Sequence, residues 1–204
     1  MRWFFAWLAL LLCAIGLSLW CAASDRLPGD LWLTRRVQDL PDWFEPLAEI
    51  LRAATTTWIV VIAGATLAAV ASLISRKWTW PIFAGIMLVV PPIQALIKNL
   101  VDRPRPDATL IERRGTFTSE SFPSGHVLGA TAFVLLCALI IVERVPAGWP
   151  RFTTWWAAAA VLCLVNGLAN VYEGVHWPSD VLGGYLWAGV FVLGAWQLAK
   201  RAQP

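Results

Sequence analysis

The stretch FPSGHVLGATAFVLLCALIIV, residues 122–142, sets a polar Pro-Ser-Gly-His segment directly before an apolar run without any charged residue. The apolar part, 127–142, approaches the length that a helix needs to cross the roughly 30 Å hydrocarbon core of a bilayer. Five other runs have the same character. We therefore expect transmembrane helices at about 3–22, 57–75, 79–97, 127–142, 152–170 and 181–198, because an isolated strand would leave its backbone groups unsatisfied in lipid.

The composition of the chain agrees with a polytopic membrane protein. Of the 204 residues, 58% are hydrophobic and 14% are charged, whereas an ordinary soluble domain carries about 25% charged residues. The length leaves room for a single membrane-embedded domain, residues 1–204. A formal net charge of +3, without a basic tail or a Gly-rich phosphate loop, argues against a nucleic-acid-binding protein. The four cysteines fall inside apolar runs without metal-ligand spacing, so we expect no metal site and no disulfide framework built on them.

The first span admits two interpretations, because Met1-Arg2, the apolar core and Cys21-Ala22-Ala23 also fit a cleaved signal peptide. The run is long for a signal peptide, so we favour a retained span. Residues 24–56 mix apolar with charged residues, which predicts one or two short amphipathic helices lying at the membrane interface. We expect the charges of this segment to form a solvated face and assign no chemistry to them.

The basic residues predict the orientation of the spans. Seven of them, at positions 2, 76, 77, 144, 151, 200 and 201, fall on one side of the membrane. The short loops 76–78 and 143–151 are basic, which favours the cytoplasm for that side. The segments 24–56, 98–126 and 171–180 are then extracytoplasmic. The two histidines of the chain, His126 and His176, lie together on this second side.

The segment 98–126 contains side chains suited to an anion. Lys98 lies one turn from the end of an apolar span, and Arg103-Pro104-Arg105-Pro106 holds two guanidiniums in an extended frame, because proline fixes φ. Such a guanidinium matches a phosphate through paired hydrogen bonds. Near a membrane, snorkelling or headgroup binding is the alternative. That alternative accounts well for Arg113-Arg114, but less well for Lys98 and Arg105.

Each histidine stands beside residues that fit a phosphate-handling site. Ser124-Gly125 precede His126 at the start of an apolar helix, where Ser is a good N-cap, Gly allows close approach of a ligand and free N–H groups attract anions. His176 and Asp180 are four residues apart, a spacing that brings them onto one face of a helical turn. A carboxylate that accepts from Nδ1–H leaves Nε2 with a free lone pair, as in a catalytic histidine. A simple cap and a structural hydrogen bond are the alternatives.

In these residues the chain resembles the type 2 phosphatidic acid phosphatase family of integral membrane lipid phosphatases. The family's first motif, K-x6-R-P, is matched by Lys98 and Arg105-Pro106, and the second, P-S-G-H, by residues 123–126. The second half of the third motif, S-R-x5-H-x3-D, is matched by His176 and Asp180. The resemblance covers the six spans and all three motif positions in the family's order. It implies an all-α fold, a six-transmembrane helical bundle with short interfacial helices.

One position departs from the family pattern. Ala169-Asn170 stand where the third motif has Ser-Arg, and in the family that Arg helps to hold the phosphate. The Asn170 side chain can donate hydrogen bonds but has no charge, and loss of one preorganised oxyanion donor typically costs about 10²–10³ in rate. Three guanidiniums on the same side are candidates to replace it: Arg103, Arg113 and Arg114. Glu173 would repel a phosphate if it pointed inward.

The resemblance implies an enzyme with a phosphohistidine intermediate. His176 would be the nucleophile, Asp180 would orient it, and His126 would protonate the leaving oxygen and then activate water. The phosphoryl oxygens would be bound by Lys98, Arg105, the N–H groups of Ser124 and Gly125, and Asn170. No metal or other cofactor is implied, since the fixed cations stabilise the charge that Mg²⁺ stabilises in many phosphoryl transferases.

The implied substrate is a lipid phosphate or pyrophosphate: undecaprenyl pyrophosphate, which we favour, phosphatidylglycerophosphate or phosphatidic acid. The implied location is a bacterial inner membrane, with the active site on the extracytoplasmic face. Two alternatives stay open. One is a lipid phosphotransferase with the same His176 intermediate, and the other is a non-catalytic lipid-phosphate-binding protein, for which Asn170 is the best argument. A small transporter is weaker, because the spans lack the buried charges of a substrate path.

Overall fold

The computed structural model describes residues 1–75, 77, 79–115, 117, 119–144 and 149–202, and only the backbone of 143–144 and 149–152. The described residues form eight helices and no strand. Six helices are long: α1 Arg2–Ala22, α4 Thr57–Ser75, α5 Thr79–Val101, α6 Gly125–Arg144, α7 Trp149–Tyr172 and α8 Pro178–Arg201. Two are short: α2 Asp30–Gln38 and α3 Phe44–Ala54.

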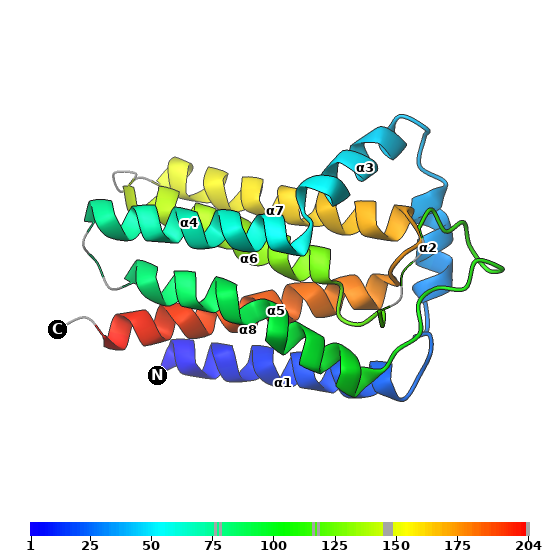
Figure 1. Ribbon diagram of the computed structural model, residues 1–204, viewed down its shortest axis with the longest axis horizontal. Coiled ribbons are helices and arrows are strands. Elements are labelled where there is room, and N and C mark those ends of the chain that lie inside the picture. Colours follow the sequence, from blue (N-terminus) through cyan, green and yellow to red (C-terminus); the bar gives the residue numbers. More distant parts are fainter. Residues whose placement is uncertain (76, 78, 116, 118, 145–148, 203–204) are drawn as a thin grey trace.

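The six long helices confirm the all-α, six-span prediction. Each contains a stretch that is long and apolar enough to cross a membrane. The helices lie along one common axis, so that α6 leads away from the end that carries α2, α7 returns to it, and α8 leads away again (Figure 1). The α5 helix continues beyond its predicted end to Val101 and therefore carries Lys98 in its last turn.

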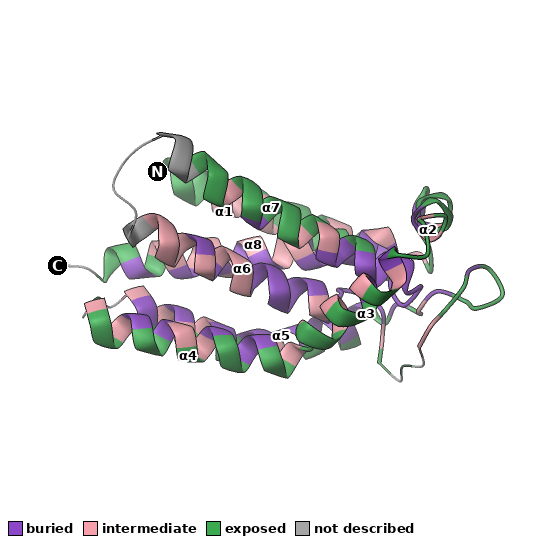
Figure 2. Ribbon diagram, turned by 90° about the horizontal axis from the view of Figure 1, so that it is seen from above, coloured by how far each residue is buried: buried purple, intermediate pink, exposed green. Residues whose placement is uncertain are grey.

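The core of the bundle lies between α4, α5, α6 and α8. Phe83 and Met87 of α5 are buried together with Leu128 and Leu136 of α6 and Ala188 of α8. Outside this core, α1 packs against α8 and α7 packs against α6. The outward faces of the bundle are exposed along much of their length (Figure 2) and carry many large apolar side chains. A continuous exposed apolar surface of this kind is typical of contact with lipid.

The segment 24–56 forms two helices, α2 and α3, at the end of the bundle opposite both chain ends (Figure 1). The α3 helix packs on α7, where the rings of Phe44 and Tyr172 meet edge to face with centroids 5.2 Å apart. The expectation that the charges of this segment form only a solvated face is wrong. Asp30, the first residue of α2, is 4% exposed and faces the interior of this end of the bundle.

Candidate active site

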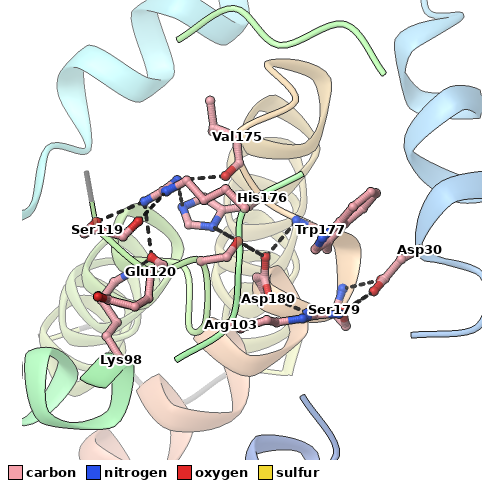
Figure 3. Close-up of polar contacts among 12 residues, drawn as sticks. Asp30, Lys98, Arg103, Ser119, Glu120, Val175, His176, Trp177, Ser179 and Asp180 are labelled. Atoms are coloured by element: carbon pink, nitrogen blue, oxygen red, sulfur yellow. Dashed lines mark hydrogen bonds and ion pairs between the residues drawn. The ribbon is translucent and has the colours of Figure 1, made fainter. Parts of the chain in front are cut away.

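His176 lies in the turn between α7 and α8, and its imidazole points toward Asp180 of α8 (Figure 3). The distance from His176 Nδ1 to Asp180 Oδ2 is 3.7 Å. The two residues meet as predicted, but not through the expected helical turn, since α8 begins only at Pro178. Asp180 instead caps the start of α8 by accepting the Trp177 N–H at 2.8 Å. The helix cap therefore positions the carboxylate, and the histidine precedes the helix.

The Asp180 carboxylate is fully buried and held by further donors. Arg103 Nη1 donates to Oδ1 at 2.5 Å, and Ser121 Oγ donates to Oδ2 at 2.5 Å. The same Ser121 hydroxyl lies 3.5 Å from His176 Nδ1. Buried charges require such partners, because an unpaired carboxylate is costly away from water. The carboxylate consequently has a fixed position beside Nδ1.

Arg103 joins this site to α2. Its side chain is completely buried and bridges two carboxylates, with Nη2 donating to Asp30 Oδ2 at 2.8 Å. Ser179 completes the network, because its hydroxyl accepts from Arg103 at 2.7 Å and donates to Asp30 at 2.7 Å. Burial by itself would lower the pKa of Arg103, but Asp180 and Asp30 outweigh it and hold the pKa above its usual value. Both Nη groups of this guanidinium are bound by protein carboxylates, and its buried Nε has no hydrogen-bond partner. The two groups with which Arg103 would hold a phosphate are therefore occupied.

Arg105 lies on the other side of the His176 ring. Its Nη1 is 3.5 Å from Nε2 of His176 and donates to the Val175 carbonyl at 2.7 Å, and its Nε donates to the Ser119 carbonyl at 2.8 Å. The guanidinium also stacks over Phe117, 4.4 Å from the ring centroid. Burial lowers the pKa of Arg105 to about 10, and the nearby Arg52 adds to the decrease. The group stays charged at pH 7 and places a positive charge on the Nε2 side of the imidazole.

The His176 imidazole is neutral in this environment. The side chain is almost fully buried, and this burial lowers the pKa of His176 to about 3. The charges of Arg105 and Lys98 add to the decrease, whereas the Asp180 carboxylate opposes it. A neutral ring with a carboxylate at Nδ1 is the form in which Nε2 carries its lone pair. The site therefore presents Nε2 as an electron-pair donor toward the space next to Arg105.

Lys98 and His126 complete the set of predicted residues at this end of the bundle. Lys98 is buried and donates through Nζ to the Glu120 carbonyl (Figure 3). His126 lies in the first turn of α6 and interacts electrostatically with Lys98 and Arg105, the two cations that also act on His176. The parity of the spans thus brings both imidazoles to one end, beside a shared pair of cations.

Of the two predicted phosphate ligands in the second motif, the Ser124 N–H has another partner, whereas the Gly125 N–H has no intrahelical acceptor. The Ser124 N–H donates to the Asp180 carbonyl at 3.1 Å, so the expectation that it is free for a phosphoryl oxygen is wrong. Its hydroxyl is buried without a hydrogen-bond partner. At Gly125, an added Cβ would collide with the side-chain amide of Gln94, so glycine here permits contact between α5 and α6. The first backbone hydrogen bond of α6 runs from the Leu128 N–H to the Ser124 carbonyl. The N–H groups of 125–127 therefore have no intrahelical acceptor.

The third-motif position and its suggested replacements also differ from expectation. Asn170 is fully buried, and its Nδ2 donates to the Asn166 carbonyl of its own helix at 2.8 Å, not toward the site. Arg113 Nη1 donates to the Pro106 carbonyl at 3.4 Å. Arg114 pairs with Glu45 and Glu112, at 3.2 Å and 3.0 Å. Arg103 and Arg114 are thus paired with carboxylates, and Arg113 donates to a backbone carbonyl; among the described residues, none of the three makes a hydrogen bond to His176.

Sequence reasoning missed two residues of this site, Asp30 and Ser121. Asp30 follows Pro28-Gly29 and begins a helix, a pattern that signals only a favourable N-terminal charge. Its partners Arg103 and Ser179 are 73 and 149 residues away in the chain. Nothing in the local sequence indicates which distant group such a carboxylate will meet.

Comparison with known proteins supports the resemblance found in the motifs. The profile of the PAP2 superfamily matches residues 78–204. Phosphatidylglycerophosphatase B of Bacillus subtilis is 31% identical over 93 residues, which are 46% of this chain and 44% of that protein. Lipid A 1-phosphatase of Rhizobium etli is 29% identical over 151 residues, 62% of this chain and 58% of that protein. The chain thus spans about half the length of these curated relatives.

The fold has a counterpart among solved structures. The crystal structure of a transmembrane PAP2-type phosphatidylglycerolphosphate phosphatase from Bacillus subtilis covers 97% of both chains, with a TM-score of 0.81 and 19% sequence identity. At this identity the likeness concerns the fold alone. Six apolar helices of spanning length and a profile match over more than half of its residues show that the chain is an integral membrane protein and belongs to the PAP2 superfamily.

Proposed function

We propose that this protein is a membrane lipid phosphatase that works through a phosphohistidine on His176. One observation carries the proposal: the neutral His176 ring lies between the Asp180 carboxylate at Nδ1 and the Arg105 guanidinium at Nε2. A carboxylate on one ring nitrogen and a cation on the other is the arrangement that directs the lone pair of Nε2 at a bound anion.

In the first step, Lys98 and Arg105 hold the phosphoryl oxygens, and Nε2 of His176 attacks phosphorus. The N–P bond forms as the bond to the leaving oxygen breaks, and His126 donates the proton that this oxygen needs. Asp180 stabilises the positive charge that develops on the His176 ring, as an orienting carboxylate does for a catalytic histidine. The products of this step are a phosphohistidine and a free lipid alcohol; from a lipid pyrophosphate, the second product is a lipid monophosphate.

In the second step, His126, now neutral, removes a proton from water while the water oxygen attacks phosphorus. The N–P bond breaks, inorganic phosphate leaves, and His126 is again protonated for the next cycle. Fixed cations carry the electrostatic stabilisation throughout. In the part of the chain that the structure describes, no three His, Cys, Asp or Glu side chains gather as a metal site. Independence from metal is a prediction for the assay below.

We further propose a lipid phosphate or pyrophosphate as the substrate. The site lies at one end of a bundle whose outer surface is apolar, so a lipid can keep its tail in the membrane while its headgroup reaches His176. The two curated relatives are named for phosphatidylglycerophosphate and lipid A, and undecaprenyl pyrophosphate stays our favoured substrate. Short basic loops on the opposite side favour an extracytoplasmic site in a bacterial inner membrane.

The test is phosphate release by the purified protein from a panel of these lipids, in EDTA, with and without orthovanadate. We expect release from at least one lipid, no loss in EDTA, inhibition by orthovanadate and no turnover by His176→Ala. Release that requires Mg²⁺ or survives His176→Ala would contradict the mechanism. Phosphoryl transfer to a second lipid without free phosphate would indicate a phosphotransferase. Binding of orthovanadate without turnover of any lipid would indicate a non-catalytic protein.

A further inference from the structure

The site contains a guanidinium that no motif includes. Arg52 lies in the last turn of α3, far in sequence from the three motif segments. Its guanidinium is 5.2 Å from the centroid of the Phe117 ring, the ring over which Arg105 also stacks at 4.4 Å. Arg52 therefore shares with Arg105 the aromatic side chain that flanks the Nε2 side of His176.

The hydrogen bonding of Arg52 is incomplete on its buried side. Its Nη1 is shielded from solvent and has no hydrogen-bond partner. An unsatisfied buried donor typically costs about 1–3 kcal/mol, and more when it is charged. A basic residue in the last helical turn is ordinarily explained by the helix dipole. That explanation does not account for a guanidinium over an aromatic ring with one nitrogen buried and unpaired.

The charges around Arg52 point toward a shared anion. Arg52 interacts electrostatically with His126 and with Arg105, and both interactions are repulsive toward a positive neighbour. Together with Lys98, these groups concentrate positive charge next to the two imidazoles. A phosphoryl dianion between them would reverse the repulsion and give the unpaired donor an acceptor.

Glu173 connects Arg52 with the position where the family has its arginine. Glu173 lies in the turn directly after α7, three residues beyond Asn170; it is almost fully buried and attracts Arg52. Burial raises the pKa of Glu173, and Arg52 opposes that increase. The attraction places a negative charge near the Arg52 guanidinium, although Oε1 of Glu173 is itself buried without a hydrogen-bond partner. This attraction accounts for a carboxylate that, from sequence alone, would only repel a phosphate.

We propose that Arg52 binds the phosphoryl group and supplies, from α3, the cation that Asn170 lacks. The inference rests on the proposed function, since it assigns Arg52 to the same phosphoryl group. It explains how the site can have a third cation, beside Lys98 and Arg105, although Arg103, Arg113 and Arg114 are bound to carboxylates or carbonyl groups. It also gives the segment 24–56 a second direct link to the chemistry, beside Asp30.

The test compares Arg52→Gln and Arg52→Lys with Arg36→Gln. Arg36 of α2 is a matched control because its side chain is 65% exposed, pairs with Asp39 at 3.6 Å and, like Arg52, lies over an aromatic ring, that of Trp32. We expect Arg52→Gln to lower kcat/KM for the lipid substrate about 10²-fold and to weaken orthovanadate inhibition by a similar factor. Arg52→Lys should recover part of both losses, and Arg36→Gln should match the wild type. The thermal midpoint without ligand should change little, whereas stabilisation by orthovanadate should disappear in Arg52→Gln.

A second arm restores the cation from the family position. Asn170→Arg should raise the activity of Arg52→Gln at least tenfold and should change the wild-type protein little. Equal gains in both backgrounds, or Arg52→Gln within threefold of wild type in turnover and orthovanadate inhibition, would overturn the inference. If Asn170→Arg does not fold, the comparison of Arg52→Gln, Arg52→Lys and Arg36→Gln with the wild type decides whether Arg52 binds the phosphoryl group.

The outcomes separate this inference from the proposed function. A wild-type protein that releases phosphate while Arg52→Gln is equally active refutes the role of Arg52 and leaves the phosphatase intact. A wild-type protein without turnover, in which orthovanadate stabilisation nevertheless requires Arg52, refutes the phosphatase and leaves Arg52 as an anion ligand.

Discussion

Replacing Asp30 by asparagine removes a buried charge that joins α2 to the active-site network. The carboxylate accepts four hydrogen bonds: from Leu27 N at 2.8 Å, Ser179 N at 3.0 Å, Ser179 Oγ at 2.7 Å and Arg103 Nη2 at 2.8 Å. Asparagine has the same shape, but it offers one oxygen in place of two and sets an N–H₂ group against donors. Arg103 then keeps only Asp180 as a charged partner.

The expected loss of stability in Asp30→Asn follows from the burial of the Asp30–Arg103 pair. Breaking a buried ion pair by removing one partner typically costs about 3–5 kcal/mol. Because Arg103 retains Asp180, we expect the lower end, about 3 kcal/mol. For a protein of this size, about 1 kcal/mol lowers the melting temperature by about 2–4 °C. Asp30→Asn should therefore melt about 6–12 °C below the wild type in detergent.

The measurement is thermal unfolding of the purified variants, with Asp39→Asn, at the C-cap of the same helix, as the control. Asp39 is 69% exposed and pairs with Arg36 at 3.6 Å, and exposed pairs contribute about 0–1 kcal/mol. Its substitution should shift melting by no more than about 3 °C. If Asp30→Asn melts within 2 °C of the wild type, or no lower than Asp39→Asn, the assigned role of the Asp30–Arg103 pair is wrong.

Three further predictions concern single residues. His126→Gln should slow turnover about 10²–10⁴-fold, and kcat/KM for a nitrophenyl ester, whose leaving group needs no proton, should fall less than kcat/KM for the lipid; equal losses of kcat/KM for both substrates would argue against proton donation by His126. Burial lowers the folded pKa of His176 to about 3 from about 6.5 in the unfolded chain, so the unfolded state binds more protons below pH 6.5 and stability falls as pH falls. By linkage the free energy of unfolding is about 2 kcal/mol lower at pH 5 than at pH 7 because of His176. When unfolding is measured at both pH values, His176→Gln should lack this difference; a variant with the same pH dependence as the wild type would contradict a neutral His176 ring. Gly174 has φ of 65°, and a Cβ there would overlap the Glu112 carbonyl, so Gly174→Ala should cost about 2 kcal/mol or more, measured as a lower melting temperature, whereas a neutral substitution would show that this turn readily rearranges.

The hydropathy of the chain and the motif spacing were sufficient to predict the helical bundle and the end of it that carries the site. The lengths of the apolar runs predicted the six long helices, and span parity placed His126 and His176 at one end. Lys98 and Arg105 could be assigned to that end because no apolar run separates them from His126. These inferences depend only on local sequence properties and on the number of membrane crossings between two residues.

The remaining features depend on contacts that local sequence does not encode. Arg103 and Arg105 look alike in the sequence, yet one is bound between two carboxylates and the other lies beside Nε2 of His176. Their difference follows from the docking of α2, which brings Asp30 to Arg103 alone. Gly125 was read as a place for a ligand, but the space of its missing Cβ is filled by Gln94 from α5. In each case the partner comes from a helix that hydropathy cannot position.

The most direct measurement of the central claim is the identification of the phosphorylated residue. Protein mixed with a lipid phosphate is quenched in base, where phosphohistidine survives, and its peptides are sequenced by mass spectrometry. The account predicts one phosphoryl group on His176. With a nitrophenyl ester, whose leaving group needs no proton, it predicts more of this phosphohistidine in His126→Gln, because that variant still forms the intermediate but hydrolyses it slowly. Turnover with no phosphorylated peptide, or with the phosphoryl group on His126 or another residue, would contradict the account.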